Sequence, residues 1–454
     1  MPTPQKKEAE KKDPSVGPPY QSPRGMRDLI GDEWFRYQGF MEKAAEVALY
    51  YGFQPIELPI LEQEDVFVHG TGETTDIVTK EMYTLRTKGG DHLALRPEGT
   101  PNTMRAYLEH GMQSLPQPVS LYYHGPLFRH DKPQRGRYRQ FYTFGCELIG
   151  SEKAVNDVML MQVIASILRE VGLPNFSFEV NSLGDKECRV AYKKALVGYY
   201  RKFQGELSAH SRELLRDNPL RILDSKEPRE IELSLDAPAS MDYLTGPAKA
   251  HFKEVLDYLE ALHLPYRMNN RIVRGLDYYN RTVFEIVATV PDGAIDNETG
   301  PPVPSEAKPL SGLALGGGGR YDYLGKVMGG KRDIPAVGFG LGVDRIVEIC
   351  SKDIAPRIVR KPKFSFIQLG NEAKMRSMEV IEVLREAKVP IMHSLAKDSL
   401  GAQLGKTEEL GVPYVIILGQ KEVMEKSVIV RDMKTRSQDS VRITELADYL
   451  KKLK

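Results

Sequence analysis

The stretch that most limits the fold of this chain runs from Leu127 to Gly150 and reads LFRHDKPQRGRYRQFYTFGCELIG. Pro133 and Gly136 interrupt it, which predicts a β-hairpin whose first strand ends near Arg129 and whose return strand covers about 137–148. Alternate residues of the return strand would share one face: Arg137, Arg139, Phe141, Thr143, Gly145 and Glu147. Burying so many charges is costly for each unpaired ion, so this face either contacts water or lines a site for a polyanion.

The size and charge of the chain limit the classes of protein to consider. With 454 residues it is long for a single core, so two or three domains are expected. The 63 basic and 62 acidic residues give a formal net charge of +1, which argues against binding nucleic acid through bulk charge. Any RNA binding must therefore be local.

Cysteine usage and hydropathy indicate a reducing compartment. Cys146, Cys188 and Cys350 lie far apart without a CxxC pair, so neither a disulfide framework nor a zinc cluster is indicated. No run of about eighteen apolar residues occurs, so no membrane span is expected, and we predict a cytoplasmic location. Residues 1–22 predict a flexible, solvated tail; a basic RNA-contacting arm is the less favoured alternative, because acidic residues dilute its lysines.

The segments before the hairpin predict a helix and several short strands. Apolar residues at helical spacing predict a helix over 33–51. A proline-bearing strand over 53–61 is expected at a sheet edge or a subunit interface. Two further strands are expected near 82–85 and 92–95.

The sequence LRPEGT, residues 95–100, connects the last of these strands to a helix expected over 101–109. Thr100 is the expected N-cap of that helix. Glu98 is either a first-turn acid favoured by the helix dipole or a functional carboxylate.

Beyond the hairpin, a helix over 152–171 and a strand over 176–181 are expected. The composition then shifts to charged helices, so we place a helical insertion over 185–264, interrupted by a polar loop at 224–240. The basic residues of the insertion form either a solvated helix face, which is favoured, or a nucleic-acid surface.

Two strands, over 266–273 and 279–287, flank the sequence RGLDYY. An arginine and two tyrosines thus stand where a strand pair turns. Residues 291–309 are rich in Pro and Glu, lack periodicity and predict a mobile surface loop.

Two glycine-rich strands follow. The run Gly316–Gly319 is no Walker loop, because no Lys-Ser or Lys-Thr follows, and it lacks the βαβ frame of a dinucleotide fingerprint. Its glycines more simply permit close approach of another backbone or of a ligand. Residues 336–342 alternate glycine with apolar residues, which leaves one face of the strand without side chains, so that a flat ligand could lie on it. A helix expected over 344–350 follows and carries Arg345.

The last part of the chain predicts a separate domain. Residues 351–362 form a short, basic segment that contains two prolines, which is typical of a linker. Residues 363–454 alternate strands and helices and predict an α/β domain of about ninety residues.

Three arginines, Arg129, Arg274 and Arg345, stand at strand ends in aromatic or glycine-rich settings. Guanidinium groups fixed in this way suit the oxygens of a triphosphate. Glu98 and Glu147 are then available for a cationic or hydrogen-bond-donating small ligand. Each arginine taken alone is better explained by a structural salt bridge, but the three together are not.

The combination of FRHDKPQRGRYRQF, GCE, LRPEGT, RGLDYYNRTVFE, GGGRYD and GFGLGVDR resembles the histidyl-tRNA synthetase family, within class II of the aminoacyl-tRNA synthetases. The resemblance covers the chain from Ser22 to the C-terminus, and RGLDYY is specific to the histidyl family. It implies an α+β catalytic domain over 23–350 with a mainly antiparallel sheet and the helical insertion, followed by an anticodon-binding α/β domain over 363–454. Residues 33–59 would form the dimer element of a homodimer.

The resemblance also implies roles for individual residues. Arg129 would contact the α-phosphate of ATP and Arg345 the γ-phosphate, with Arg274 as a fixed cation near the α-phosphate and Mg²⁺ on the phosphates. Gln134 and Arg135 would face the acceptor end of tRNA(His).

The histidine-binding residues implied are Glu98, Gly99, Thr100, Thr143, Glu147, Tyr278 and Tyr279. Glu98 and Thr100 would hold the α-amino group, Glu147 and Tyr279 the imidazole, and Tyr278 would line the pocket. Thr143 departs from the family, which usually has Gln there; the shorter hydroxyl would reach the substrate amine through water.

The implied reaction is ATP-dependent activation of L-histidine, followed by transfer to the 3′ end of tRNA(His). The alternative is a catalytically inactive, synthetase-like regulatory subunit of histidine biosynthesis. Such paralogues usually lack the C-terminal domain and several of these residues, whereas this chain has both. A synthetase-like RNA-sensing module would be expected to lose Arg129, Glu98 or Arg274, and none is lost.

Overall fold

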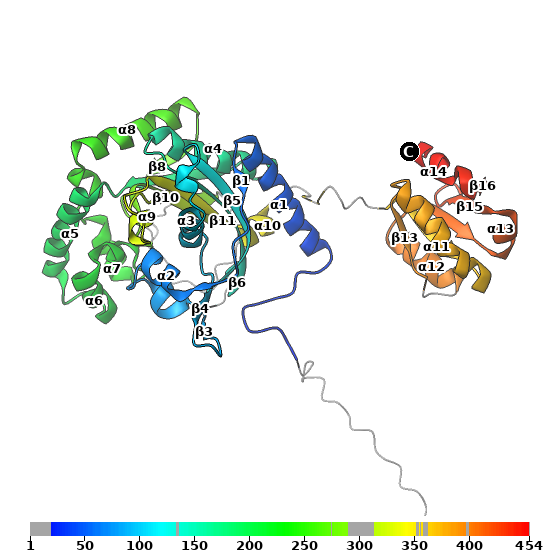
Figure 1. Cartoon of the computed structure of the whole chain (residues 1–454), viewed down its shortest axis with the longest axis horizontal. Coiled ribbons are helices and arrows are strands. Elements are labelled where there is room, and N and C mark those ends of the chain that lie inside the picture. Colours follow the sequence, from blue (N-terminus) through cyan, green and yellow to red (C-terminus); the bar gives the residue numbers. More distant parts are fainter. Residues whose placement is uncertain are drawn as a thin grey trace, which may run out of the picture. The chain divides into compact units, whose positions relative to one another are not determined.

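The computed structural model describes residues 20–132, 136–273, 275–288, 313–350, 354, 356, 362–395 and 399–453, apart from the side chain of Lys406. The features predicted above that lie outside these ranges are most of the tail, the loop over 291–309, most of the linker, Arg274, Gln134 and Arg135. The chain divides into two units, Met1–Pro356 and Arg357–Lys454 (Figure 1). None of the helices in the described ranges is long and apolar enough to cross a membrane.

The first unit is built on an eight-stranded sheet in the order β1-β5-β6-β11-β10-β9-β7-β8. Its strands, in chain order, are β1 Gln54–Pro55, β5 Val119–Phe128, β6 Gln140–Ile149, β7 Phe176–Ser182, β8 Tyr266–Met268, β9 Asn280–Ala288, β10 Leu313–Arg320 and β11 Ala336–Gly342. The neighbours from β5 to β7 pair antiparallel, and only the edge pairs β1–β5 and β7–β8 are parallel. The predicted mainly antiparallel sheet is therefore confirmed, and the proline-bearing strand does lie at an edge.

Strand alternation gives this sheet two different faces. Phe144 and Cys146 of β6 and Phe339 of β11 point into a core with the helices α1 (Asp32–Tyr50), α4 (Ala154–Glu170), α8 (Gly246–Ala261) and α10 (Val343–Ile349). Figure 1 shows α4 between α1 and α8. Thr143, Gly145 and Glu147, one residue out of phase on β6, therefore face the opposite side, where α3 (Thr100–Glu109) lies.

A smaller, three-stranded sheet is formed by the residues that precede α3 in the chain. Its order is β2-β4-β3, with β2 Leu61–Gln63, β3 Thr84–Arg86 and β4 His92–Leu95. Helix α2 (Glu64–Thr71) and a π-helical turn at Ile77–Glu81 connect β2 to β3.

The segment between the parallel strands β7 and β8 is helical, with α5 Lys186–Tyr200, α6 Ala209–Asp217, α7 Pro228–Leu235 and then α8. The predicted polar loop at 224–240 is wrong, because α7 lies within it. The buried carboxylate of Glu230 stabilises this region by accepting hydrogen bonds from Ser211 Oγ at 2.7 Å and Ser225 Oγ at 2.5 Å. Ser225 lies five positions and Ser211 nineteen positions before Glu230, both outside α7, so the periodicity of that helix does not reveal them.

The second unit has a five-stranded sheet in the order β13-β12-β14-β15-β16. Its elements are β12 Phe364–Gln368, α11 Asn371–Glu386, β13 Ile391–His393, α12 Leu400–Glu409, β14 Tyr414–Leu418, α13 Gln420–Glu425, β15 Ser427–Asp432, β16 Gln438–Arg442 and α14 Ile443–Lys452. Strands β13, β12 and β14 are parallel, whereas β15 and β16 are antiparallel. The α/β prediction is confirmed, although α13 and β16 were not predicted.

Candidate active site

The carboxylate of Glu147 lies at the centre of the helix α3 side of the sheet. It is completely buried and accepts three hydroxyl hydrogen bonds. Thr100 Oγ1 and Tyr123 Oη donate to Oε1 at 2.7 and 3.2 Å, and Tyr321 Oη donates to Oε2 at 2.5 Å. The three donors come from α3, from β5 and from the residue after β10, so the acid joins segments that are far apart in the sequence.

This environment sets the charge of Glu147. Burial raises the pKa of the carboxyl to about 7, although the three hydroxyl donors oppose the shift; the Glu98 carboxylate nearby raises it further. Burial and the Glu147 carboxylate hold the pKa of the Tyr123 and Tyr321 phenols well above 10, so both remain donors at neutral pH. The group therefore changes charge in the physiological range.

Glu98 precedes α3 and forms the second acidic group of the site. Its Oε1 accepts from Thr71 Oγ1 at 3.2 Å, and its Oε2 accepts from Tyr278 Oη at 3.3 Å. Gly99 between the two acids packs on the Tyr123 ring, where any β-carbon would overlap the ring atoms. The site thus has two buried carboxylates lined with hydroxyl groups.

The expectation that Thr100 caps α3 is wrong. Gly99 occupies the N-cap position, and Thr100 is the first helical residue. Its hydroxyl donates to Glu147 instead. A hydrogen bond to a buried carboxylate is stronger than one to a neutral backbone group, which explains the preference.

Tyrosine rings close one side of the site. The ring centroid of Tyr278 lies 4.5 Å from that of Tyr279 and 5.7 Å from that of Tyr321. The Tyr279 ring lies against Gly319, where an added β-carbon would be 2.9 Å from Tyr279 Cδ1. The glycine run of β10 therefore admits a tyrosine ring, in agreement with the predicted close approach.

The bare face of β11 is only partly open. The Glu147 carboxylate lies directly over Gly338, where a β-carbon would be 2.5 Å from Glu147 Cδ. A β-carbon added at Gly340 would be 3.6 Å from Thr143 Oγ1, which is an ordinary contact distance. Thr143 is buried, and its hydroxyl donates to the Leu341 carbonyl at 3.1 Å, so the structure shows it bonded to the backbone.

Of the predicted arginines, Arg129 lies beside the segment that carries Glu98, and Arg345 lies beside the hairpin loop and β10. Arg129 Nε donates to the Pro97 carbonyl at 2.9 Å, and its guanidinium lies 5.5 Å from the Phe141 ring centroid. Arg345, on α10, donates to the carbonyls of Gly136 at 3.2 Å and Ala314 at 2.7 Å. Burial, together with the nearby Arg137 cation, lowers the pKa of Arg345. The carboxylates of Glu285 and Asp344 oppose this shift.

Strand β6 begins at Gln140, so the prediction that Arg137 and Arg139 lie on its site-facing side is wrong. Arg137 forms an ion pair with Asp131. Arg139 Nε donates to the Asp131 carbonyl at 3.1 Å, and its backbone N–H donates to Gly25 at 2.7 Å. Both arginine side chains hold the hairpin loop, while the Arg139 carbonyl accepts from the Arg129 N–H at 2.8 Å and continues the strand pairing by one step.

Comparison with known proteins identifies the family. A family model described as histidyl-tRNA synthetase matches residues 25–185, and one described as an anticodon binding domain matches residues 363–453. A histidine–tRNA ligase of Dehalococcoides mccartyi is 39% identical over 434 residues, which make up 95% of this chain and 99% of that protein. The chain belongs to the histidyl-tRNA synthetase family.

Further members of the histidyl-tRNA synthetase family agree over nearly the whole chain. A histidine–tRNA ligase of Lactococcus lactis subsp. lactis is 39% identical over 92% of this chain and 94% of its own length. The crystal structure of apo S. aureus histidyl-tRNA synthetase matches with a TM-score of 0.76 at 28% identity, covering 95% of this chain and 100% of that one. The class II fold prediction is thereby confirmed.

Three hydroxyl residues that bond to the two acids were not predicted from the sequence: Thr71, Tyr123 and Tyr321. Tyr321 stands in the GGGRYD motif that carried the family resemblance, so that motif gave a signal. Thr71 and Tyr123 gave none, because they reach the two acids only after the smaller sheet and β5 fold around α3.

Proposed function

We propose that this chain is a histidine–tRNA ligase that activates L-histidine with ATP to histidyl-adenylate and transfers the histidyl group to the 3′ end of tRNA(His). The observation that carries the proposal is the buried Glu147 carboxylate with its three hydroxyl donors and a second acid, Glu98, beside it. A carboxylate and a phenol facing the two ring nitrogens select an imidazole, because a side chain without those groups would leave buried polar atoms unpaired.

In this proposal Glu147 accepts the imidazole N–H, Tyr279 bonds the other ring nitrogen and Tyr278 lines the pocket. The α-amino group of histidine donates to the Glu98 carboxylate and to Thr100 Oγ1, whose own proton is directed at Glu147. Gly99, the remaining predicted histidine-binding residue, makes room for the Tyr123 ring. Thr143 contacts the amine through water, because its hydroxyl donates to the Leu341 carbonyl.

The arginines provide the proposed ATP site. Arg129 is fixed by the bond from its Nε to the Pro97 carbonyl, and we place its terminal nitrogens on the α-phosphate. Arg345 would bind the γ-phosphate, and Arg274 would be the fixed cation near the α-phosphate. Their positive charge stabilises the transition state while the histidine carboxylate attacks the α-phosphorus and pyrophosphate leaves.

Mg²⁺, when bound, neutralises charge on the ATP phosphates. No cluster of three or more His, Cys, Asp or Glu side chains suited to a metal occurs in the described residues. This donor set fits an ion held mainly by substrate phosphates and water, as Mg²⁺ usually is.

The remaining assignments concern tRNA and assembly. We place the acceptor end of tRNA(His) at Gln134 and Arg135, and its anticodon at the domain over 363–454, which contains the match to an anticodon binding domain. The catalytic domain would cover 23–350, with the insertion over 185–264 against the acceptor stem. A homodimer formed through α1 and a cytoplasmic location complete the proposal; exposed Trp34, Leu49 and Tyr50 on α1 support the former.

The regulatory-subunit alternative is less well supported. Hydroxyl groups of Thr100, Tyr278 and Tyr321 bond to the two acids, and the C-terminal domain is present. A subunit without aminoacylation would need neither the arginines nor a domain for the anticodon.

The test is ATP–pyrophosphate exchange with each of the twenty amino acids, in the absence of tRNA. Exchange with histidine alone supports the proposal, and no exchange from a folded protein refutes it in favour of the regulatory subunit. Arg274→His should abolish exchange and spare tRNA binding in a filter assay. Normal exchange in that variant would show the role given to Arg274 to be wrong.

A further inference from the structure

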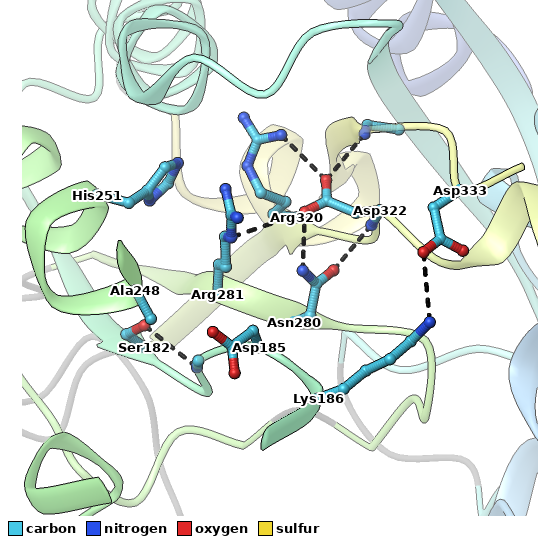
Figure 2. A network of polar contacts seen from close by, with 12 residues as sticks. Ser182, Asp185, Lys186, Ala248, His251, Asn280, Arg281, Arg320, Asp322 and Asp333 are labelled. Atoms are coloured by element: carbon cyan, nitrogen blue, oxygen red, sulfur yellow. Dashed lines mark hydrogen bonds and ion pairs between the residues drawn. The ribbon is translucent and has the colours of Figure 1, made fainter. Parts of the chain in front are cut away.

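A buried polar network joins the two segments that carry the tyrosines of the pocket. Asn280 Nδ2 donates to Asp322 Oδ2 at 2.9 Å, and the backbone N–H of Asp322 donates to Asn280 Oδ1 at 2.8 Å. Figure 2 shows these two side chains facing one another. Both are buried, so each reciprocal bond forms away from water, where an unpaired partner would be costly.

The pair lies at an irregularity of the sheet. Along β10 and β9, Gly319 is paired with Val283, but the next residue, Arg320, is paired with Asn280. Two residues of β9, Arg281 and Thr282, are therefore extra, and Arg281 adopts a positive φ of 47°. Bulges of this kind turn side chains toward functional sites. Here only Asn280, paired with Arg320, separates Tyr279 from the bulge, so we infer that the bulge and this pair together set the direction of the Tyr279 side chain.

The Asp322 side of the pair is anchored to the body of the unit. Arg320 is fully buried and donates to Asp322 Oδ1 at 3.1 Å and to Asp157 Oδ1, on α4, at 3.1 Å. The N–H of Ala336, the first residue of β11, also donates to Asp322 Oδ1, at 3.1 Å. Asp322 is thus held by three elements, and Tyr321 stands between two immobilised neighbours.

We propose that Asn280 and Asp322 are positioning residues for imidazole recognition: their reciprocal hydrogen bonds lock the segments that present Tyr279 and Tyr321 to the pocket closed by Glu147. The inference rests on the proposed function. Neither residue touches Glu147; each acts through the neighbouring tyrosine. Tyr321 Oη reaches Glu147 Oε2 at 2.5 Å, a distance that a small rotation of the segment would lengthen beyond hydrogen bonding.

The test compares Asn280→Ala, Tyr321→Phe and their double variant in histidine-dependent ATP–pyrophosphate exchange. We expect each single variant to raise KM for histidine about tenfold, through loss of one hydrogen bond to a carboxylate, and to leave KM for ATP unchanged. The double variant should exceed Tyr321→Phe only by the part of the Asn280→Ala effect that acts through Tyr279, so the two effects should fall short of multiplying. Effects that multiply in the double variant, or equal rises in both KM values, would overturn the positioning role.

A charge-neutral swap separates positioning from loss of folding. Asn280→Asp alone sets two carboxylates against each other, whereas Asn280→Asp combined with Asp322→Asn restores one amide and one carboxylate. The swapped pair should return KM for histidine to within about threefold of the unaltered chain; failure to do so, in a variant with unchanged thermal unfolding, counts against the proposal. Lys186→Ala is the matched control, since Lys186 forms an exposed ion pair with Asp333 at 3.3 Å in the same region (Figure 2).

Failure of the proposed function would be distinguishable. If the unaltered chain shows no histidine-dependent exchange, the proposed function fails, and the same variants are compared by calorimetric titration with L-histidine. A Kd that is unchanged by Asn280→Ala, or no binding to the unaltered chain, would then overturn the positioning role, and a weaker Kd would support it.

Discussion

Gly338→Ala should disable histidine recognition through Glu147, although Gly338 has no side chain to contact substrate in the proposed site. The new β-carbon would overlap Glu147 Oε2 and lie 2.5 Å from Glu147 Cδ, whereas ordinary carbon contacts are about 3.5–4.0 Å. The carboxylate must therefore retreat by about 1 Å or more, which breaks the 2.5 Å bond from Tyr321.

Loss of one hydrogen bond to a charged group costs about 1.5–3 kcal/mol, or roughly 10- to 150-fold in kcat/KM for histidine. Overpacking should also lower the free energy of unfolding by about 1–3 kcal/mol. The assay is ATP–pyrophosphate exchange with histidine, alongside urea unfolding. Gly198→Ala, at an exposed position of α5 with no neighbour within 4 Å, is the control and should be neutral or stabilising. A kcat/KM for Gly338→Ala within twofold of the unaltered chain would refute this reasoning.

Three further predictions follow from single contacts. Burial raises the pKa of Glu147 from 4.5 to about 7, so between these pH values the folded chain keeps a proton that the unfolded chain releases. The free energy of unfolding should therefore fall by about 3 kcal/mol as the pH rises through this range. Urea titrations at pH 5 and 8 should show this fall for the unaltered chain and not for Glu147→Gln. Thr143→Val should raise KM for histidine by less than about threefold, because its hydroxyl bonds to a backbone carbonyl; a larger rise would assign that hydroxyl to substrate. Arg96 is buried and donates to the Leu58 and Pro126 carbonyls at 2.7 and 2.9 Å. A lysine cannot reach both carbonyls, so Arg96→Lys should lower the free energy of unfolding by about 1–3 kcal/mol. An unchanged midpoint of urea unfolding would contradict this prediction.

Local patterns in the sequence predicted most of the main sheet. The hairpin β5–β6, the glycine strands β10 and β11 and helix α1 are specified by period and by turn residues, which act over a few positions. The edge position of β1 also followed from local chemistry, because proline cannot donate to a strand ladder.

The errors arose where a distant partner determines the structure. Thr100 has the chemistry of an N-cap, but a carboxylate 47 positions further along the chain takes its hydroxyl. Helix α7 lies in a stretch that reads as a loop, because its stability depends on Glu230 and serines outside the helix. The acids Glu98 and Glu147 could be proposed from motifs, but the hydroxyl groups that surround them could not. The roles given to the site residues remain predictions.

The strand order of the main sheet has a consequence for synthesis on the ribosome. Strand β11 is the last of the eight to be made, yet it lies in the interior of the sheet, between β6 and β10. Until residue 342 has left the ribosome, the growing chain has an unpaired edge on both of those strands, and the Glu147 side chain has no Gly338 beside it. Chain synthesis would therefore pass through a stage in which nearly three-quarters of the protein exists without a closed sheet. Pairing of β11 with β6 and β10 would therefore complete the sheet and bring Gly338 against Glu147 in a single step.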